Sequence, residues 1–454
     1  MREIRIRDTL TNELRTLESG QDGSVGIYAC GPTTYGPIHI GNARAFVIPM
    51  LLRRFLAHEG CRPKLVINLT DVNDKIYLAA AKRGVPSGEH AEEMIRGYVA
   101  DTDALGVGRP DHEPRATETI GPIVDLIEAL IERGHAYESG GDVYFRVRSF
   151  AGYGRLSNRD PDAMDQGEEA GAAELKEAPL DFALWKARKP PEDTFWPSPW
   201  GDGRPGWHIE CSAMAEQLLG LEFAIHGGGS DLVFPHHENE LAQTEAGRGR
   251  PLARIWMHNG MVEAASAEKM SKSARNIFLL REAIDAVGAE AVVAYLISGH
   301  YRQPIAFGVG ALEQARASNE RVREFFRGPE EPAGSVASEV RTRREAFLAG
   351  LADDFNTPRA LAEVFSLIAE ARREPLPGAR DALREMLEIL GLGALAAGEG
   401  GGPDAEAEAL LAEREEARAG RDFDRADEIR GRLAALGFEV RDTAEGARLL
   451  RRGR

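Results

Sequence analysis

The sequence predicts an α/β protein in which a parallel sheet forms the first half. Short apolar stretches without helical spacing, such as 25–29 and 64–68, alternate with stretches whose apolar residues recur at helical spacing. This alternation is typical of a parallel sheet, because neighbouring parallel strands need a long connection that is usually a helix. Beyond the middle of the chain the pattern changes, and residues 335–393 are almost all helix-forming. We therefore expect a sheet-containing part followed by a helical part.

The remaining elements follow from local signals of the same kind. Apolar spacing and turn residues predict helices at 89–105, 117–135, 282–296, 310–326 and 404–436, and strands at 142–147, 222–226 and 438–440. Three consecutive glycines, Gly227 to Gly229, predict a turn, and Pro235 is expected to precede a helix that starts near His236. Asn356 or Thr357 is expected to cap a helix with Pro358 in its first turn.

Length and composition limit the possible classes of protein. A chain of 454 residues is too long for one compact domain, so we expect two to four. Neither a membrane-spanning apolar run nor a signal peptide is recognisable, which predicts a cytoplasmic protein without a membrane partner. The 3 cysteines cannot form a disulfide framework and are either buried thiols or ligands. A net charge of −17 excludes non-specific nucleic-acid binding by the whole surface, so RNA contact needs a local basic patch.

The stretch YACGPTTYGPIHIGNAR, residues 28–44, has the pattern of a phosphate-binding site. It begins as the end of a buried strand, passes through turn residues and becomes helical from about Gly41. The N-terminus of a helix offers free backbone N–H groups and the positive end of the helix dipole to an anion. Cys30, His39 and Asn42 are expected beside this position, which suggests phosphate chemistry near a metal.

A polar segment follows the second predicted strand, Lys64 to Asn68. It contains Thr70, Asp71 and two further acidic or amide residues before Lys75. In open α/β sheets ligands bind beyond the carboxyl ends of the strands. The polar segment is therefore expected to share one crevice with His39.

Two short motifs carry a resemblance to a known family. HIGN at 39–42 is similar to the first signature of class I aminoacyl-tRNA synthetases, and KMSKS at 269–273 matches the second. The surrounding sequence resembles the cysteinyl-tRNA synthetases over essentially the whole chain. The segments that carry this resemblance are CGPTTYGPIHIGNAR (30–44), NLTDVNDK (68–75), GRPGWHIECSAMA (203–215) and HGGGSDLVFPHHENELAQ (226–243).

The resemblance implies a Rossmann-type parallel-sheet catalytic domain with an insertion, followed by a helical bundle and a small C-terminal α+β unit. The implied divisions are a first catalytic half at 1–117, an insertion at 118–205, a second catalytic half at 206–255, a KMSKS and stem-contact region at 256–328, a helical bundle at 329–395, a linker at 396–403 and an anticodon-binding unit at 404–454.

Four residues form a candidate metal site. His236 and Glu240 are four residues apart and so lie on one face of a helix, whereas Cys30 and Cys211 lie elsewhere in the chain. Thiolate, imidazole and carboxylate ligands suit tetrahedral zinc. Spacing alone leaves open two buried cysteines and an ordinary helix pair, but the resemblance implies one Zn²⁺ per chain at these four positions. Cys61 matches no ligand and is expected to be an inert thiol.

The resemblance also implies ATP-dependent activation of L-cysteine and transfer of the cysteinyl group to tRNA(Cys), with Mg²⁺ accompanying ATP. The implied catalytic residues are His39, Asn42, Lys269 and Lys272. The implied ATP-binding residues are these four together with Gly41, Gly229 and Asp231. The implied substrate-binding residues are Gly31, Thr70 and Trp207. Asn42 stands where the family signature usually ends in histidine, and its amide donates hydrogen bonds without a positive charge.

The C-terminal segment from Arg441 to Arg454 is rich in arginine and is expected to contact tRNA, although a solvated tail is the alternative. We expect a monomer. Two other functions stay open. One is a mycothiol-pathway ligase that joins cysteine to an amino sugar, against which Glu240 and the segment beyond 404 argue. The other is an inactive tRNA-binding paralogue, against which the intact signatures argue.

Overall fold

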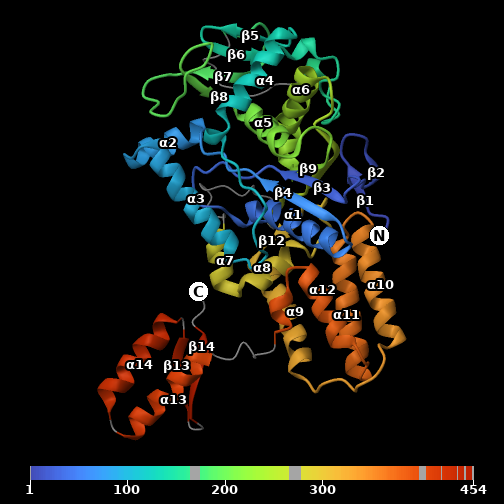
Figure 1. Cartoon of the computed structure of the whole chain (residues 1–454), viewed down its shortest axis with the longest axis vertical. Coiled ribbons are helices and arrows are strands. Elements are labelled where there is room, and N and C mark those ends of the chain that lie inside the picture. Colours follow the sequence, from blue (N-terminus) through green and yellow to red (C-terminus); the bar gives the residue numbers. More distant parts are fainter. Residues whose placement is uncertain are drawn as a thin grey trace.

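The protein is organised around a four-stranded parallel sheet, which confirms the predicted fold class. The computed structural model describes residues 2–163, 174–264, 278–397, 405–420, 422–436, 438–443 and 446–451 (Figure 1). The sheet has the order β10-β9-β3-β4. Its strands are β3 (Ser24–Ala29), β4 (Arg62–Ile67), β9 (Phe223–Gly229) and β10 (Ala253–Asn259). Two distant stretches of the chain therefore contribute neighbouring strands, and their carboxyl ends meet at one edge.

Helices connect and cover these strands. Helix α1 (Ile40–His58) joins β3 to β4, and α2 (Asp74–Arg83) and α3 (Ser87–Asp103) follow β4. Arg44 of α1 is fully buried and donates hydrogen bonds of 2.7 Å to the carbonyl oxygens of both Gly260 and Gln303. An N-terminal hairpin that the sequence did not predict, β1 (Arg5–Asp8) and β2 (Glu13–Thr16), also belongs to this region. Hydrogen bonds from Arg44 thus connect α1 to the segments that follow β10, the last strand of the sheet.

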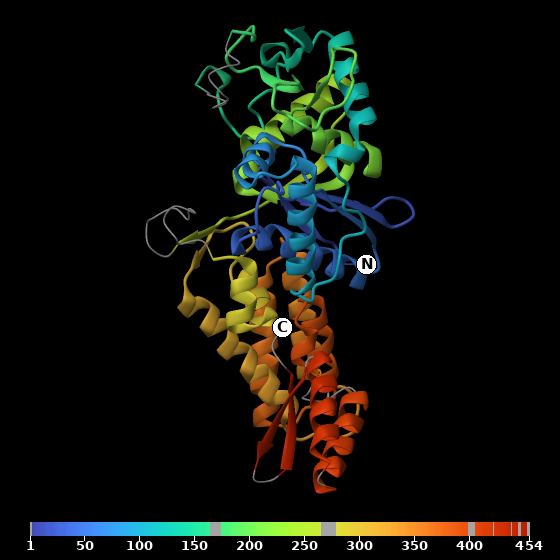
Figure 2. The same ribbon diagram turned by 90° about the vertical axis from the view of Figure 1, so that its left-hand side faces the viewer.

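An insertion follows the first half of the sheet, and its apolar side chains belong to a second hydrophobic cluster that also includes residues beyond the insertion. Its elements are α4 (Ile120–Glu132), β5 (Ala136–Ser139), β6 (Asp142–Phe145), β7 (Phe182–Ala187) and β8 (Gly203–Pro205). The strands pair as an antiparallel sheet in the order β5-β6-β7-β8. The predicted strand at 142–147 ends earlier, because the backbone N–H of Val147 bonds the Asp181 carboxylate at 2.9 Å instead of a strand partner. Both views show the insertion at one end of the molecule, with the parallel sheet in the middle (Figures 1 and 2).

The second half of the parallel sheet begins with α5 (Trp207–Leu219), and a π-helical turn at Val233–His237 leads into α6 (Glu238–Arg248). The predicted glycine turn after residue 226 is wrong, since Gly227 to Gly229 are the last three residues of β9. A Cβ on Gly227 would lie 2.8 Å from the carbonyl oxygen of Met257, and one on Gly228 would lie 3.0 Å from the His237 ring. These glycines therefore serve close packing of the strand end.

The next region connects the sheet to the helical part. It contains β11 (Val262–Ala264), α7 (Leu280–Val287), α8 (Ala289–Leu296), β12 (Ile305–Phe307) and α9 (Val309–Arg327). The prediction of one helix over 282–296 is wrong, because Gly288 adopts φ +86° and separates α7 from α8. The KMSKS motif, with Lys269 and Lys272, lies outside the described residues.

Three further helices form the bundle that the composition predicted: α10 (Ser338–Ala352), α11 (Thr357–Arg373) and α12 (Ala379–Ile389). The predicted cap is confirmed, since the Asn356 side chain accepts a hydrogen bond of 3.0 Å from the Arg359 backbone N–H. Pro358 lies in the first turn of α11. Figure 2 shows these helices on the opposite side of the sheet from the insertion.

The C-terminal unit is a pair of helices with a hairpin. Its elements are α13 (Ala405–Ala419), α14 (Phe423–Ala435), β13 (Phe438–Thr443) and β14 (Gly446–Arg451). The stretch 404–436, predicted to be helical, forms two helices, and the described part of the arginine-rich segment lies in the hairpin of β13 and β14. Among the described residues, no helix combines the length and the apolar character needed to cross a bilayer.

Candidate metal centre and active site

The structure brings together the four residues proposed as metal ligands. Cys30 follows β3, Cys211 lies in α5, His236 lies in the π-helical turn and Glu240 lies in the first turn of α6. One potential ligand atom from each lies within 4.8 Å of the others. All four residues are buried, with exposed fractions of 5% or less. Two sulfur atoms, an imidazole nitrogen and a carboxylate oxygen at this separation, all shielded from bulk water, fit a metal site.

A second group of side chains overlaps the first and was not predicted from the sequence. Cys30 and Glu240 also lie within 4.8 Å of ligand atoms of His226 and His237. The Nε2 atom of His226 lies 3.2 Å from Glu240 Oε2, and the Nε2 atom of His237 lies 3.2 Å from Cys30 Sγ. Two sequence signals could have indicated this second group. His226 lies inside the glycine-rich strand β9, and His237 directly follows His236.

Protonation in the cluster follows from its short contacts. A hydrogen bond with Cys30 lowers the pKa of Cys211 to about 6 against the effect of burial, whereas burial raises the pKa of Cys30. Burial acts against the charge of His236, but Glu240 and Cys211 raise its pKa to about 10. Burial also disfavours the charged form of Glu240, yet His236 and His226 hold the pKa of that carboxyl well below its usual range. The cluster thus already favours the thiolate of Cys211 and the carboxylate of Glu240, whereas Cys30 and His236 would each release a proton on binding a metal.

The HIGN motif forms the N-terminus of α1. His39 is the N-cap residue, and its Nδ1 accepts a hydrogen bond of 3.1 Å from the Gly41 N–H. The Asn42 Oδ1 atom accepts a hydrogen bond of 3.2 Å from the His39 N–H, which completes a capping box. Since Oδ1 makes this bond, the NH₂ group of Asn42 is the part that can donate to a ligand. These two hydrogen bonds therefore fix the backbone conformation at the predicted anion site.

The residues proposed to bind the amino acid surround the end of β4. A Cβ on Gly31 would lie 1.9 Å from the Asn68 carbonyl oxygen, so only glycine fits at this position. The backbone of Thr70 is held by the loop after β3, through hydrogen bonds of 3.3 Å to the Pro32 oxygen and 3.0 Å from the Thr34 N–H. Trp207, the first residue of α5, stacks on His236 with ring centroids 4.3 Å apart. Trp207 thus contacts the metal cluster through His236, and Gly31 follows the cluster residue Cys30 in sequence.

Gly229 and Asp231, proposed to line the adenosine pocket, lie at the carboxyl end of β9. Gly229 ends the strand, and Asp231 belongs to the 3-10 turn Ser230–Leu232 that follows. A Cβ on Gly229 would lie 2.3 Å from Asp231 Oδ1, so a larger residue there would displace the Asp231 carboxylate. Both residues are at the edge of the sheet where open α/β folds bind ligands.

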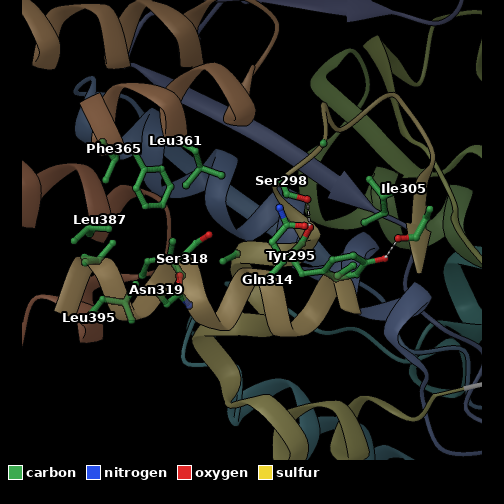
Figure 3. A pocket seen from close by; sticks show the side chains of 18 of the residues that line it. Tyr295, Ser298, Ile305, Gln314, Ser318, Asn319, Leu361, Phe365, Leu387 and Leu395 are labelled. Atoms are coloured by element: carbon green, nitrogen blue, oxygen red, sulfur yellow. Dashed lines mark hydrogen bonds between the residues drawn. The ribbon is translucent and has the colours of Figure 1, made fainter. Parts of the chain in front are cut away.

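A large cavity lies away from these groups. Figure 3 shows its position between α8, α9, β12 and the bundle helix α11, with a volume of about 510 Å³. Its lining is mostly apolar, and some of its polar groups are satisfied within the protein. The Tyr295 hydroxyl donates to the Ala306 oxygen at 3.0 Å, and the Ser298 hydroxyl donates to the Tyr295 oxygen at 2.7 Å. This cavity has none of the residues proposed for the site.

A parallel sheet, a capped helix at its carboxyl edge and a helical bundle behind it define the fold of class I aminoacyl-tRNA synthetases. Among solved structures, methionyl-tRNA synthetase of Mycobacterium tuberculosis in complex with methionyl-adenylate matches with a TM-score of 0.60 and 15% identity, covering 82% of this chain and 91% of the other. A leucyl enzyme of Agrobacterium radiobacter K84, in a ternary complex, matches with a TM-score of 0.61 and 12% identity over 84% and 86%. Identities this low support the fold alone.

Sequence comparison identifies the family. The profile described as tRNA synthetases class I (C) catalytic domain matches residues 16–317, the DALR domain matches 346–395 and the cysteinyl-tRNA ligase anticodon binding domain matches 401–448. The cysteine–tRNA ligase of Alkalilimnicola ehrlichii is 46% identical, covering 98% of each chain. That of Brevibacillus brevis is 42% identical, covering 99% of this chain and all of its own. The chain belongs to the cysteine–tRNA ligase family.

Proposed function

We propose that the protein activates L-cysteine with ATP to form cysteinyl-adenylate and transfers the cysteinyl group to tRNA(Cys). The observation that carries this proposal is the buried cluster of Cys30, Cys211, His236 and Glu240 beside the carboxyl edge of the sheet. Membership of the family supports the overall reaction. The cluster supports the choice of amino acid, because a metal discriminates a thiol from other side chains.

Zinc is the metal that we propose for the cluster, one ion per chain. Two sulfur atoms, an imidazole and a carboxylate are typical zinc ligands, and the lowered pKa of Cys211 favours its thiolate. When bound, the ion would supply a Lewis acid that accepts the sulfur of the substrate as an added ligand. Serine and alanine have no soft sulfur to offer. An apolar pocket separates single methylene groups by only about 1–3 kcal/mol, so a metal contact improves discrimination strongly.

The remaining site residues position the reactants. His39 and Asn42 would donate hydrogen bonds to phosphate or ribose at the N-terminus of α1, where the helix dipole favours the negative charge. Lys269 and Lys272 would neutralise the departing pyrophosphate, with Mg²⁺ entering as a complex with ATP. Gly41, Gly229 and Asp231 would line the nucleotide site, and Gly31, Thr70 and Trp207 would enclose the amino acid. Activation then depends on orientation and charge stabilisation rather than on a covalent enzyme intermediate.

We also propose the domain division given above, with residues 404–454 contacting the anticodon. The profile match over 401–448 supports this role and favours tRNA over an amino sugar as the acceptor. The protein would act as a monomer in the cytoplasm. Formation of a cysteine–glucosaminyl-inositol amide, without charging of tRNA, would overturn the choice of acceptor.

The test of the metal proposal compares Cys211→Ser with Cys61→Ser. Both residues are buried thiols, but Cys61 is not part of the cluster. Cys211→Ser is expected to lose zinc and the preference for cysteine over serine in ATP–pyrophosphate exchange, whereas Cys61→Ser retains both. Unchanged metal content and selectivity in Cys211→Ser would contradict the proposal.

A further inference from the structure

Tyr35 and Lys75 form an exposed pair of an aromatic ring and a cation that has no assigned role. Tyr35 lies in the loop between β3 and α1, and Lys75 lies in the first turn of α2. The Nζ atom of Lys75 lies 5.6 Å from the centroid of the Tyr35 ring, and 39% of Tyr35 is exposed. Leu78, on the same face of α2 as Lys75, is 63% exposed. One exposed apolar residue is ordinary, but this combination of an aromatic ring, a cation and an aliphatic chain suggests a binding surface.

The backbone of Tyr35 is held from two sides. The backbone N–H and the hydroxyl of Thr34 both donate hydrogen bonds of 3.0 Å to the Thr70 carbonyl oxygen, at the end of β4. On the other side, the Tyr35 carbonyl oxygen accepts a hydrogen bond of 3.0 Å from Nε2 of His90, a buried residue of α3. The ring therefore projects from a fixed backbone, which reduces the conformational entropy lost when a ligand binds.

The charge of Lys75 is available to a ligand. Asp74, the residue before it, pairs with Lys186 at 3.0 Å and also with Arg204. In the part of the chain that the structure describes, no carboxylate forms an ion pair with Lys75. The N-terminus of α2 adds the positive end of a helix dipole at the same position. In a protein with a net charge of −17, this is a local position that suits a phosphate group.

The order of the strands indicates which reactant would occupy this position. In the sheet β10-β9-β3-β4, the proposed nucleotide residue Gly229 ends β9, and the proposed metal ligand Cys30 follows β3. Lys75 comes after β4, the edge strand on the opposite side of β3 from β9. The pair thus lies on the side of the proposed amino-acid site away from Gly229. Of the three reactants, the end of the tRNA is the one for which this side is left.

We infer that Tyr35 and Lys75 bind the terminal adenosine of the tRNA, with the adenine stacked on the Tyr35 ring and Lys75 at the adjacent phosphate. Unpaired RNA ends are commonly recognised by stacking of bases on aromatic side chains, together with cations along the backbone. Leu78 extends the apolar surface beside the pair. This inference rests on the proposed function, because it assumes that the cysteinyl group is transferred to a tRNA.

The variants for the test are Tyr35→Ala, Tyr35→Phe, Lys75→Ala and the control Lys82→Ala. Lys82 is an exposed lysine in the last turn of the same helix. The first readout is cysteine-dependent ATP–pyrophosphate exchange, in which tRNA is omitted. The second is kcat/KM for tRNA(Cys) in aminoacylation. The third is the affinity for tRNA(Cys) with and without its terminal adenosine, measured in the absence of cysteine and ATP.

Tyr35→Ala is expected to lower kcat/KM for tRNA(Cys) by about 5- to 150-fold, the range that corresponds to loss of one stack between a base and an aromatic ring. Exchange stays unchanged, and Tyr35→Phe, which keeps the ring, resembles the unsubstituted protein. The unsubstituted protein should bind intact tRNA(Cys) more tightly than the shortened form, and Tyr35→Ala should remove this difference. Unchanged aminoacylation, a parallel loss of exchange, or equal weakening of both tRNAs would overturn the inference.

Lys75→Ala tests the phosphate contact through its dependence on salt. Losing one contact to a single strand should reduce the slope of log kcat/KM for tRNA against log salt concentration by about 0.7. Lys82→Ala should leave the slope unchanged, and an unaltered slope in Lys75→Ala would contradict the contact. If the unsubstituted protein shows no cysteine-dependent exchange, the proposed function itself fails, which is distinct from failure of this inference.

Discussion

Replacing Gly31 by alanine gives a quantitative test of the crowded junction between β3 and β4. The added Cβ would lie 1.9 Å from the Asn68 carbonyl oxygen and 3.0 Å from the carbonyl carbon. Ordinary contact between carbon and oxygen begins near ~3.3 Å, so one backbone segment must move by more than about 1 Å. Overpacking of this kind costs about 1–3 kcal/mol of folding free energy.

The same displacement moves the groups on either side of Gly31. Cys30 precedes it, and Asn68 holds Thr70. A misplacement of about 1 Å can lower a rate by ~10²-fold, so kcat/KM for cysteine-dependent ATP–pyrophosphate exchange should fall by about that factor. The assay is exchange kinetics, with a urea unfolding curve on the same preparation.

Gly97→Ala is the matched control. Gly97 lies inside α3, and a Cβ there would meet no atom within 4 Å. Alanine should stabilise the helix by about 0.5–1 kcal/mol and leave exchange unchanged. Unaltered kinetics and stability in Gly31→Ala would refute the reasoning about this junction.

Three further predictions concern other parts of the chain. In metal-free protein, the thiolate absorbance of Cys211 should appear with a midpoint near pH 6, because the hydrogen bond with Cys30 lowers the pKa from 9.0 to about 6. Ionisation of this thiol should stabilise the folded state increasingly as the pH rises from 6 to 9. Cys211→Ser should abolish the absorbance transition, and a midpoint near pH 9 in the unsubstituted protein would contradict the prediction. Asn356→Ala should lower the free energy of unfolding by about 1 kcal/mol through loss of the α11 cap, measured by urea denaturation. Gly288→Ala should destabilise the α7–α8 junction by at least about 1 kcal/mol, because its φ of +86° disfavours a side chain, and a neutral result would contradict the assignment.

The sequence contained enough information for the parallel sheet, the bundle and the four clustered ligand residues. The alternation of apolar runs and amphipathic stretches reflects burial directly, so the α/β class was predictable. Cys30 and Cys211 are 181 positions apart, and spacing alone left them as ordinary buried thiols. Only the resemblance to a family connected them, and the structure then brought them within reach of one ion.

Other features depended on tertiary context. The glycines at 227–229 have turn propensity, yet close packing against Met257 and His237 places them in a strand. The sequence is amphipathic on both sides of Gly288, so its apolar spacing alone did not reveal the break between α7 and α8.

The central claim is that substrate sulfur binds a metal held by Cys30, Cys211, His236 and Glu240. Zinc-edge X-ray absorption of the metal-loaded protein, recorded with and without L-cysteine, tests it most directly. The account predicts one additional zinc–sulfur distance of about 2.3 Å with L-cysteine and none with L-serine. A spectrum that L-cysteine leaves unchanged, while cysteine-dependent exchange proceeds, would contradict it.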